Sequence, residues 1–474
     1  MKKITVERVF IYIALIFGIL FVFLTPPFLS PDEDTHFLKS YSVSKGIAYP
    51  IVKNGRMGNS FPKQMINDIN KKLEFNGNMK KKYTYQDYFN EQFDIMDYNK
   101  KIFISYSTQT VVPIAYTAPS IGIIFSKIMA KIFKLQNVSV SYMLQFARLF
   151  SLIFSITLIY FAIKITPIYK KLMASIALIP TSLYLCSMVT YDSLIFACSL
   201  LAISIMLRLI FDKKHKCITK KEIIILTILG IVLFNVKIIY SFIYILMFFV
   251  PSEKFGGSKR KIKLFSLVIF IILVFTILFK LPINLLNVTS SSDSRALKQY
   301  NFIFNHPFKY LGYIYYNLVN QRLFYINTMF GGFGFLDTYL PLAIISLYII
   351  FLPLITLAEN SINKYKINNI IKILLAVCIF LSVVAIFTAL YTGWTVLFNR
   401  VGTKDIVGVQ GRYFIPLIFP TLLLLSNKLI KDNKFFDIIR NNYFVIPTLS
   451  LLISIFIIIF RFWAWRRKLW KEFY

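Results

Sequence analysis

The stretch VFIYIALIFGILFVFLTPPFL, residues 9–29, carries no charged side chain over 21 positions. At a rise of about 1.5 Å per residue, a helix of this length crosses a hydrocarbon layer of roughly 30 Å. No small-residue cleavage site follows, and Pro26 and Pro27 intervene, so we interpret it as an uncleaved first transmembrane helix rather than a signal peptide. Because 57% of the 474 residues are hydrophobic, the composition predicts an all-α polytopic membrane protein, with the lipid bilayer as a partner.

The net charge of +33 is concentrated in short loops between apolar segments. Five such loops together hold 21 Lys and Arg: residues 164–171, 208–222, 252–263, 359–372 and 428–440. Two apolar segments separate each neighbouring pair, so all five lie on one side, which the positive-inside rule makes cytoplasmic. No nucleic-acid-binding motif accompanies the charge, so we expect a lipid surface and no nucleic acid as its partner.

The side of the N-terminus then fixes which segments cross. Lys2, Lys3 and Arg8 predict a cytoplasmic N-terminus. If residues 9–29, 111–134 and 141–163 all crossed, every basic loop would be outside, so one of the three does not cross. The segment 111–134 is interrupted by Pro113 and Pro119 and has a lysine-bearing face, which predicts an amphipathic interfacial helix.

This topology gives about eleven transmembrane helices and a large first extracytoplasmic loop. The chain divides into residues 1–29 (N-terminus and first helix), 30–140 (first extracytoplasmic loop with the interfacial helix 111–134), 141–286 (transmembrane helices), 287–340 (second long extracytoplasmic loop) and 341–474 (transmembrane helices and basic tail). The basic tail would also be extracytoplasmic, against the charge rule. We expect a multi-pass protein of the cell membrane.

The sequence SPDEDTHF, residues 30–37, clusters acids where the first helix leaves lipid, although the chain has only 21 acids against 54 Lys and Arg. Charged groups at that depth are costly unless they are solvated or paired, so we interpret the cluster of Asp32, Glu33 and Asp34 as a candidate functional site. One alternative is a solvated helix cap. Another is a divalent metal bound by Asp32, Asp34 and His36, because these offer oxygen and nitrogen ligands at alternate positions.

Cationic residues on the same side predict an anion site. Arg412 lies in GVQGRYFIP, residues 408–416, where glycines let backbone approach a ligand and a guanidinium grips phosphate oxygens in bidentate fashion. Lys237 interrupts two short apolar runs and either reaches the interface or meets an anion. Supporting residues are Gln410 and Tyr413. The alternative for Arg412 and Tyr413 is an interface anchor.

Two more charged residues lie at helix ends on this side. Asp192, in VTYDS, is either a site residue or a helix N-cap, a service that Thr190 and Ser193 also offer. Arg148 lies seven residues into a span, where pairing with an acid is the simplest interpretation and a supporting role in the site is the other.

These segments together resemble a bacterial family of polytopic membrane proteins of undefined function that is placed in the GT-C glycosyltransferase superfamily. The resemblance is carried by SPDEDTHF, FARLF, SMVTYDS, NVKIIY, GGFGFLDTYLP and GVQGRYFIP in this order along nearly the whole chain. It implies a GT-C-like fold whose large first outer loop carries interfacial helices. It also implies transfer of a sugar from a polyprenyl-phosphate donor to a glycan or polymer acceptor outside the membrane.

By the same resemblance, an acid of the first outer loop is the base, which maps to Asp32 or Glu33, and the carrier phosphate maps to Arg412 and Lys237. The chemistry is consistent, since an extracytoplasmic active site has no nucleotide sugar and needs a donor carried on lipid. The rival functions are a transporter or flippase for a lipid-linked glycan, a polysaccharide polymerase or ligase, and a scaffold for envelope assembly. A transporter would place charges along a path through the membrane, whereas these collect at one surface.

Overall fold

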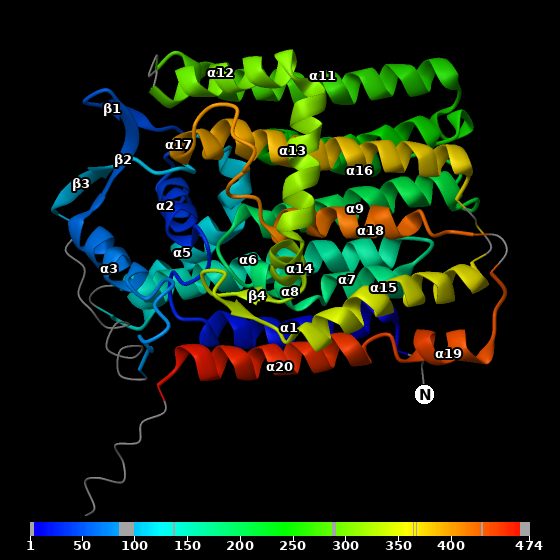
Figure 1. The fold of residues 1–474 in the computed structure, drawn as a ribbon, viewed down its shortest axis with the longest axis horizontal. Coiled ribbons are helices and arrows are strands. Elements are labelled where there is room, and N and C mark those ends of the chain that lie inside the picture. Colours follow the sequence, from blue (N-terminus) through cyan, green and yellow to red (C-terminus); the bar gives the residue numbers. More distant parts are fainter. Residues whose placement is uncertain are drawn as a thin grey trace, which may run out of the picture.

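The protein is a bundle of long helices capped at one end by a small mixed domain (Figure 1). This computed structural model describes residues 4–84, 99–135, 138–286, 291–363, 365, 367–427 and 430–464. Within these ranges, eight segments are long and apolar enough to cross a membrane: α1 Val6–Leu24, α6 Val140–Ile165, α9 Tyr191–Phe211, α10 with η2 Lys220–Phe249, α11 Ser258–Asn284, α15 Leu342–Ile362, α16 with η4 and α17 Asn369–Phe398, and α19 with α20 Lys434–Phe462. A polytopic membrane protein is therefore confirmed, whereas the count of eleven helices stays a prediction.

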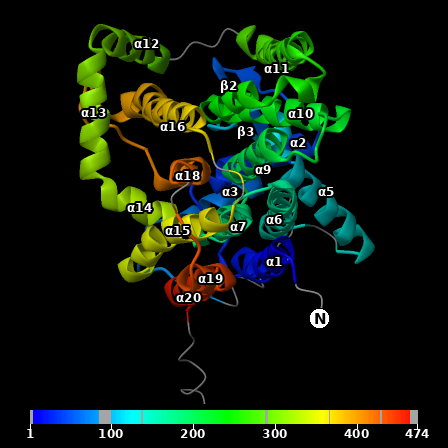
Figure 2. The same cartoon turned by 90° about the vertical axis from the view of Figure 1, so that its right-hand side faces the viewer.

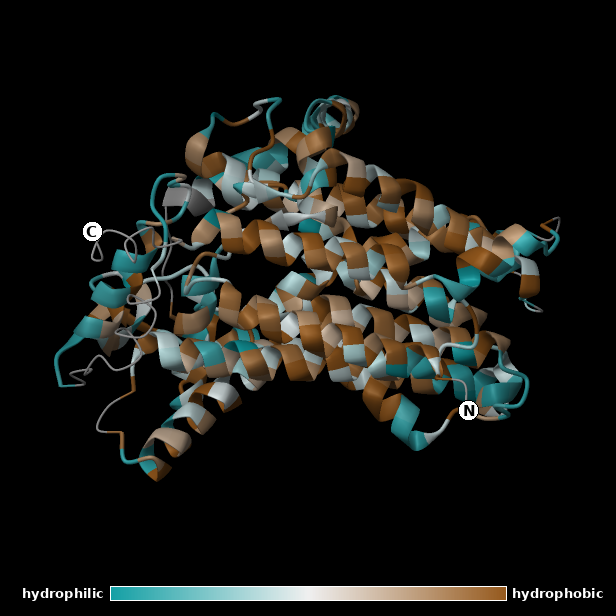
Figure 3. Ribbon diagram, turned by 90° about the horizontal axis from the view of Figure 1, so that it is seen from below, coloured by the Kyte–Doolittle hydropathy of each residue, from teal (hydrophilic) through white to brown (hydrophobic). Residues whose placement is uncertain are grey.

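Polar residues collect at the two ends of the bundle. Figure 3 shows hydrophobic ribbon through the middle of the long helices and hydrophilic ribbon at both ends. This distribution is what a bilayer requires, because the hydrocarbon layer leaves no water for polar groups. Of the eight candidate spans, α9 is the most buried and α11 the least. The core is therefore built around α9, and α11 lies at the periphery (Figure 2).

Two short consecutive helices, separated by a break in the chain's helical structure, lie beside α9. They are α7 Lys170–Ala177 and α8 Pro180–Cys186, and both are buried. Pro180 occupies the first turn of α8, where its missing N–H costs nothing, but it cannot continue α7 because its ring clashes with the preceding turn.

The chain reverses direction at Lys237, the last residue of α10 (Lys220–Lys237). The following helix η2, Ile238–Phe249, runs back along α10, and the Tyr244 hydroxyl donates to the Leu226 carbonyl. At the far end, Ile218 N–H donates to the Lys254 carbonyl of η3 (Ser252–Phe255) at 2.9 Å. The segment 220–249 therefore forms a hairpin, and Lys237 lies at its tip.

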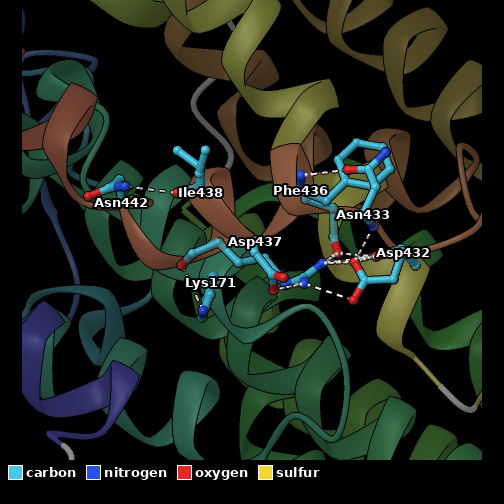
Figure 4. A network of polar contacts seen from close by, with 10 residues as sticks. Lys171, Asp432, Asn433, Phe436, Asp437, Ile438 and Asn442 are labelled. Carbon is cyan, nitrogen blue, oxygen red and sulfur yellow. Dashed lines mark hydrogen bonds and ion pairs between the residues drawn. The ribbon is translucent and has the colours of Figure 1, made fainter.

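The predicted basic loops meet at the end of the bundle opposite the sheet. Arg440 of α19 (Lys434–Asn441) pairs with Asp432 and Asp437, and its Nη1 donates to the Ala358 carbonyl at 2.7 Å. Lys171 Nζ donates to the Arg440 carbonyl at 2.6 Å, and Figure 4 shows Lys171, Asp432 and Asp437 in this network. Loops 164–171, 359–363 and 430–440 are thus in contact, as the charge argument requires. Whether this end is cytoplasmic stays a prediction.

The opposite end carries a cap made from the first long loop. Its elements are α2 Glu33–Ser44, β1 Ile51–Lys53, β2 Arg56–Pro62, α3 Lys63–Leu73, β3 Lys101–Ile104, η1 Pro113–Tyr116 and α5 Thr117–Ile132. The strands form an antiparallel sheet in the order β1-β2-β3, so the prediction of an all-α fold is wrong here. Asn54 and Gly55 have φ of 51° and 71°, the conformation of a tight hairpin turn that an Asn-Gly pair favours.

The predicted interfacial helix corresponds to two consecutive elements, η1 and α5. Pro113 begins η1 and Pro119 lies in the first turn of α5, where neither interrupts a hydrogen bond. The 16 residues of α5 pack closely along α6, because a Cβ at Gly122 would lie 2.4 Å from the Phe146 carbonyl oxygen. With this length α5 is not among the eight candidate spans. Its interfacial position stays a prediction.

The second long loop is mostly helical. It contains α12 Ser291–Asn305, α13 Pro307–Asn320, α14 Arg322–Phe330 and the two-stranded sheet β4 Gly332–Phe333 and β5 Thr338–Tyr339. Figure 2 shows α13 as an arch at the edge of the bundle between α12 and α14. The Tyr310 hydroxyl of α13 lies 2.9 Å from the Thr388 hydroxyl of α16 (Asn369–Leu390), which holds the arch to the bundle.

The last part of the chain returns to the capped end. After η4 Tyr391–Thr395 and α17 Val396–Phe398, an irregular segment leads to η5 Gly411–Phe414, α18 Ile415–Leu423 and α20 Val445–Phe462. Trp463 bridges Tyr83 of the first loop, and its Nε1 donates to the Leu24 carbonyl at 2.8 Å. The last helix therefore ends beside the first long loop, and the extracytoplasmic side of this end stays a prediction. Residues 465–474 of the basic tail lie outside the described residues.

Candidate functional site

A buried ion pair fixes the corner between α1 and α2. Arg148 of α6 is 1% exposed, and its Nε and Nη2 donate to the two carboxylate oxygens of Glu33 at 2.8 and 2.5 Å. The same guanidinium donates to the carbonyls of Val22, Thr25 and Pro26, which lack helical partners at the end of α1. The sequence interpretation of Arg148 as the partner of an acid is thus confirmed.

Glu33 is held on all sides by this arrangement. Its side chain is fully buried, and Oε1 accepts a further hydrogen bond from the Val189 N–H at 3.1 Å. A substrate hydroxyl would reach this carboxylate only after the pair with Arg148 had broken, which is costly for a buried pair. The geometry therefore favours a positioning role for Glu33 over the catalytic role that the sequence predicted.

Asp32 lies on the other side of this corner, at the surface. It is the N-cap residue of α2, with φ of 61° in the left-handed region, but its side chain makes no capping hydrogen bond. Its Oδ2 instead accepts from Arg412 Nη2 at 2.9 Å, and the Asp32 side chain is 53% exposed. The alternative of a simple helix cap therefore does not describe the Asp32 carboxylate.

Four charged side chains from four separate segments meet here. Lys237 Nζ lies 2.6 Å from Asp192 Oδ1, and Arg412 Nε lies 3.5 Å from Asp192 Oδ2. Asp192 thus stands between the two cations, and Arg412 connects it to Asp32. Asp192 is not the N-cap of α9, because the Thr190 hydroxyl accepts from the Asp192 N–H and takes that role. We call Asp32, Asp192, Lys237 and Arg412 the charged cluster.

Aromatic side chains enclose the charged cluster. Lys237 Nζ lies 4.9 Å from the centre of the Tyr191 ring and 4.2 Å from that of Tyr413. Tyr240 anchors Tyr413, because its hydroxyl donates to the Tyr413 carbonyl at 2.7 Å. Tyr191 and Tyr240 were not predicted as site residues, although they lie in the motifs TYDS and NVKIIY.

His36 closes one side of the charged cluster as a neutral imidazole. Its Nδ1 lies 2.8 Å from the Tyr116 hydroxyl, and its ring meets Tyr191 edge-on at 4.6 Å. Burial lowers the pKa of His36 to about 4, although the nearby carboxylates of Asp32 and Asp192 oppose this shift. His36 is therefore uncharged at neutral pH.

Asp34, like Glu33, lies outside the charged cluster. It is half-buried, and burial raises its pKa above the usual range of an aspartate. On helix α2, Asp34 and His36 point about 200° apart because successive residues rotate by about 100°. In the part of the chain that the structure describes, no three His, Cys, Asp or Glu side chains are grouped to hold a metal ion. The alternative metal site of Asp32, Asp34 and His36 is therefore not formed.

Arg412 is the most deeply placed member of the charged cluster. Its side chain is 4% exposed, and among the described residues its Nε and Nη1 have no hydrogen-bond partner. The buried Gln410 Oε1 likewise has none there. The sequence predicts that Gly411 leaves room for a ligand, and the structure contradicts this. A Cβ at Gly411 would lie 1.9 Å from the Tyr325 carbonyl oxygen of α14. The glycine serves this close packing, which presses η5 against α14 and aims Arg412 inward.

The comparison with protein families identifies the chain at the level of its family. Residues 15–421 match the family described as "Predicted membrane protein (DUF2142)", and the chain belongs to this family. No curated protein and no solved structure matches the chain.

Proposed function

We propose that this protein is a membrane glycosyltransferase of GT-C type that transfers a sugar from a polyprenyl-phosphate donor to a cell-envelope glycan or polymer. The observation that carries the proposal is the charged cluster. A buried guanidinium, whose Nε and Nη1 have no hydrogen-bond partner among the described residues, lies beside a half-exposed carboxylate at one end of a membrane bundle. Such a pair offers an anion-binding group and a proton acceptor within reach of one ligand.

The roles follow from burial and pairing. Asp32 is the base, because it is the exposed carboxylate of the charged cluster. Arg412 binds the donor phosphate. Lys237 balances the negative charge of Asp192, so Asp192 does not cancel the positive charge of Arg412. The ion pair of Glu33 and Arg148 fixes the backbone between α1 and α2, and this positions Asp32.

The reaction balances within these groups. An acceptor hydroxyl attacks the anomeric carbon and gives its proton to Asp32, while the bond between that carbon and the phosphate oxygen breaks. The phosphate leaves with the bonding electrons, and Arg412 stabilises the charge that develops on it. The sugar–acceptor bond replaces the sugar–phosphate bond, and no oxidant or reductant is needed.

The proposed topology places this chemistry on the extracytoplasmic face. Three shorter segments, 170–186, 238–249 and 411–423, lie between or beside the eight candidate spans. If each of them crosses as well, with α10 and η2 counted separately, the chain makes eleven passes. Eleven passes put the basic loops on one side and residues 30–140 on the other, where a lipid-borne donor is the available sugar source.

The proposal is tested by reconstitution. The purified chain in lipid vesicles is given a polyprenyl-phosphate sugar, and release of free polyprenyl phosphate is measured with envelope glycan as acceptor. We expect wild-type protein to release it and Asp32→Asn to release none. A matched analysis of a deletion strain separates the rival functions. A missing side-chain sugar indicates transfer, whereas loss of the whole polymer indicates export or polymerisation and contradicts the proposal.

A further inference from the structure

Among the described residues, one side of Arg412 meets a cavity too small for a ligand. Ser182, Asp192 and Tyr240 help to line a small cavity on its inner side, with a volume of about 10 Å³. This is room for about one water molecule, which could accept a hydrogen bond from Arg412, but it excludes a phosphate group. On the outer side the guanidinium meets Asp32, whose carboxylate is half-exposed. In the described structure the half-exposed neighbour of Arg412 is Asp32, so an anion that comes from this side meets the position that Asp32 occupies.

The charges of the cluster lead to the same conclusion. Two carboxylates, Asp32 and Asp192, face two cations, Lys237 and Arg412, so the charged cluster is neutral as it stands. A phosphate added to it would leave one or two negative charges uncompensated at a partly buried site, which is unfavourable. Releasing one carboxylate to water removes most of this cost.

The two carboxylates differ in how easily they can leave. Asp192 is 9% exposed and lies between Lys237 and Arg412, so its release would strand a buried charge. Asp32 is 53% exposed and has a single ion-pair partner among the described residues, so its carboxylate regains water when it leaves; because Arg412 is buried, we take the contact at about 1 kcal/mol, the upper value for surface pairs. Asp32 is therefore the group that an anion displaces.

We propose that the Asp32 carboxylate occupies the place of the donor phosphate on Arg412, and that donor binding displaces it and frees it to act as the base. This inference rests on the proposed function. In the protein without donor, the Asp32 carboxylate and the donor phosphate therefore compete for Arg412. Binding and activation become one event, because the base is unpaired from Arg412 only when a phosphate has taken its place.

The experiment measures phosphate binding to proteins that lack this competitor. Asp32→Asn and Asp32→Gly both suit the positive φ at this position, because asparagine and glycine tolerate the left-handed conformation, so both should fold. Asp34→Asn is the matched control, because it removes an acid two residues away that lies outside the charged cluster. Arg412→Gln removes the proposed phosphate ligand.

Each full-length protein, purified in detergent, is titrated with farnesyl phosphate by calorimetry, with farnesol and inorganic phosphate as comparison ligands. We expect Asp32→Asn and Asp32→Gly to bind farnesyl phosphate about fivefold more tightly than wild type, the factor that loss of a competing contact of about 1 kcal/mol gives. Asp34→Asn should bind as wild type does, and Arg412→Gln should lose most of the affinity. Farnesol should show no gain.

The outcomes separate this inference from the proposed function. If wild type binds farnesyl phosphate and both Asp32 variants bind it equally or more weakly, displacement is wrong while the phosphate site stands. If no variant and no wild-type protein binds it, the phosphate site and the inference both fail. If the gain occurs for inorganic phosphate but not for farnesyl phosphate, the site does not take a lipid-borne phosphate and the inference is overturned.

Discussion

Glu33→Gln is the substitution that best separates positioning from catalysis at the acidic stretch. It keeps the size of the side chain but leaves the Arg148 charge uncompensated in a site where both partners are essentially inaccessible. Two charge-assisted hydrogen bonds are lost or weakened, each worth about 1.5–3 kcal/mol, and the amide oxygen restores about 1 kcal/mol of this. Since breaking a buried pair costs about 3–5 kcal/mol, we expect a loss of about 3 kcal/mol in the free energy of unfolding.

The assay is unfolding of the purified protein in mixed micelles by increasing amounts of a denaturing detergent, followed by circular dichroism. Asp34→Asn is the control, and we expect it to change the free energy of unfolding by less than about 1 kcal/mol, because Asp34 has no ion pair in the described structure. Arg148→Gln in the Glu33→Gln background removes the stranded charge. The double variant should therefore be less destabilised than the sum of the two single variants, by roughly 0.5–3 kcal/mol.

The opposite result would refute the reasoning. If Glu33→Gln unfolds within about 1 kcal/mol of wild type but transfers no sugar, then Glu33 is a catalytic residue and its burial in the pair is not its role. If the double variant is destabilised by the full sum of the single variants, the two side chains do not act as a pair.

Three further predictions follow from the described site and ends. Arg412→Lys keeps the charge but loses the planar fork, so sugar transfer should fall at least tenfold with expression unchanged, and full activity would remove Arg412 from the site. Because His36 stays neutral down to about pH 4 when folded and protonates near pH 6.5 when unfolded, its contribution to stability is complete above pH 6.5 and is lost towards pH 4. Wild type should lose about 3 kcal/mol more than His36→Gln between these pH values, and equal losses would contradict the buried neutral imidazole. In intact cells, an impermeant thiol reagent should label the double variant Asn70→Cys, Cys217→Ser. The same reagent should not label wild-type protein at the exposed Cys217, and labelling of both proteins would overturn the topology.

The sequence could predict the spans and the residues of the site because both depend on local patterns. Uncharged runs identify transmembrane helices, and acids or arginines at their ends are rare enough to mark candidates. Arg148 could be predicted to meet an acid. Which acid it meets depends on tertiary packing, because Glu33 is 115 positions away along the chain. Sequence patterns that extend over a few residues do not identify which distant residues pair.

The difference between Asp32 and Glu33 shows this limit most clearly. The two neighbours look alike in the sequence, yet one is 53% exposed and the other fully buried. Their roles separate because α2 begins at Glu33, so the left-handed backbone at Asp32 turns the two side chains in different directions. The sheet of the first loop, by contrast, has a local signal in the sequence, because Asn54-Gly55 is a pair that favours a tight β-hairpin turn.

The distribution of charge along the helices bears on the choice between transfer and transport. Between Asp192 and Arg208 in α9, and between Arg148 and Lys164 in α6, the sequence has no charged residue. The ion pairs at one end, around Arg412, and at the other, around Arg440, are thus joined by apolar helix. A transport path would be expected to carry charged groups at intermediate depth. Chemistry at one end of the bundle, on a substrate whose lipid anchor stays in the bilayer, needs none, and this arrangement therefore favours a transferase.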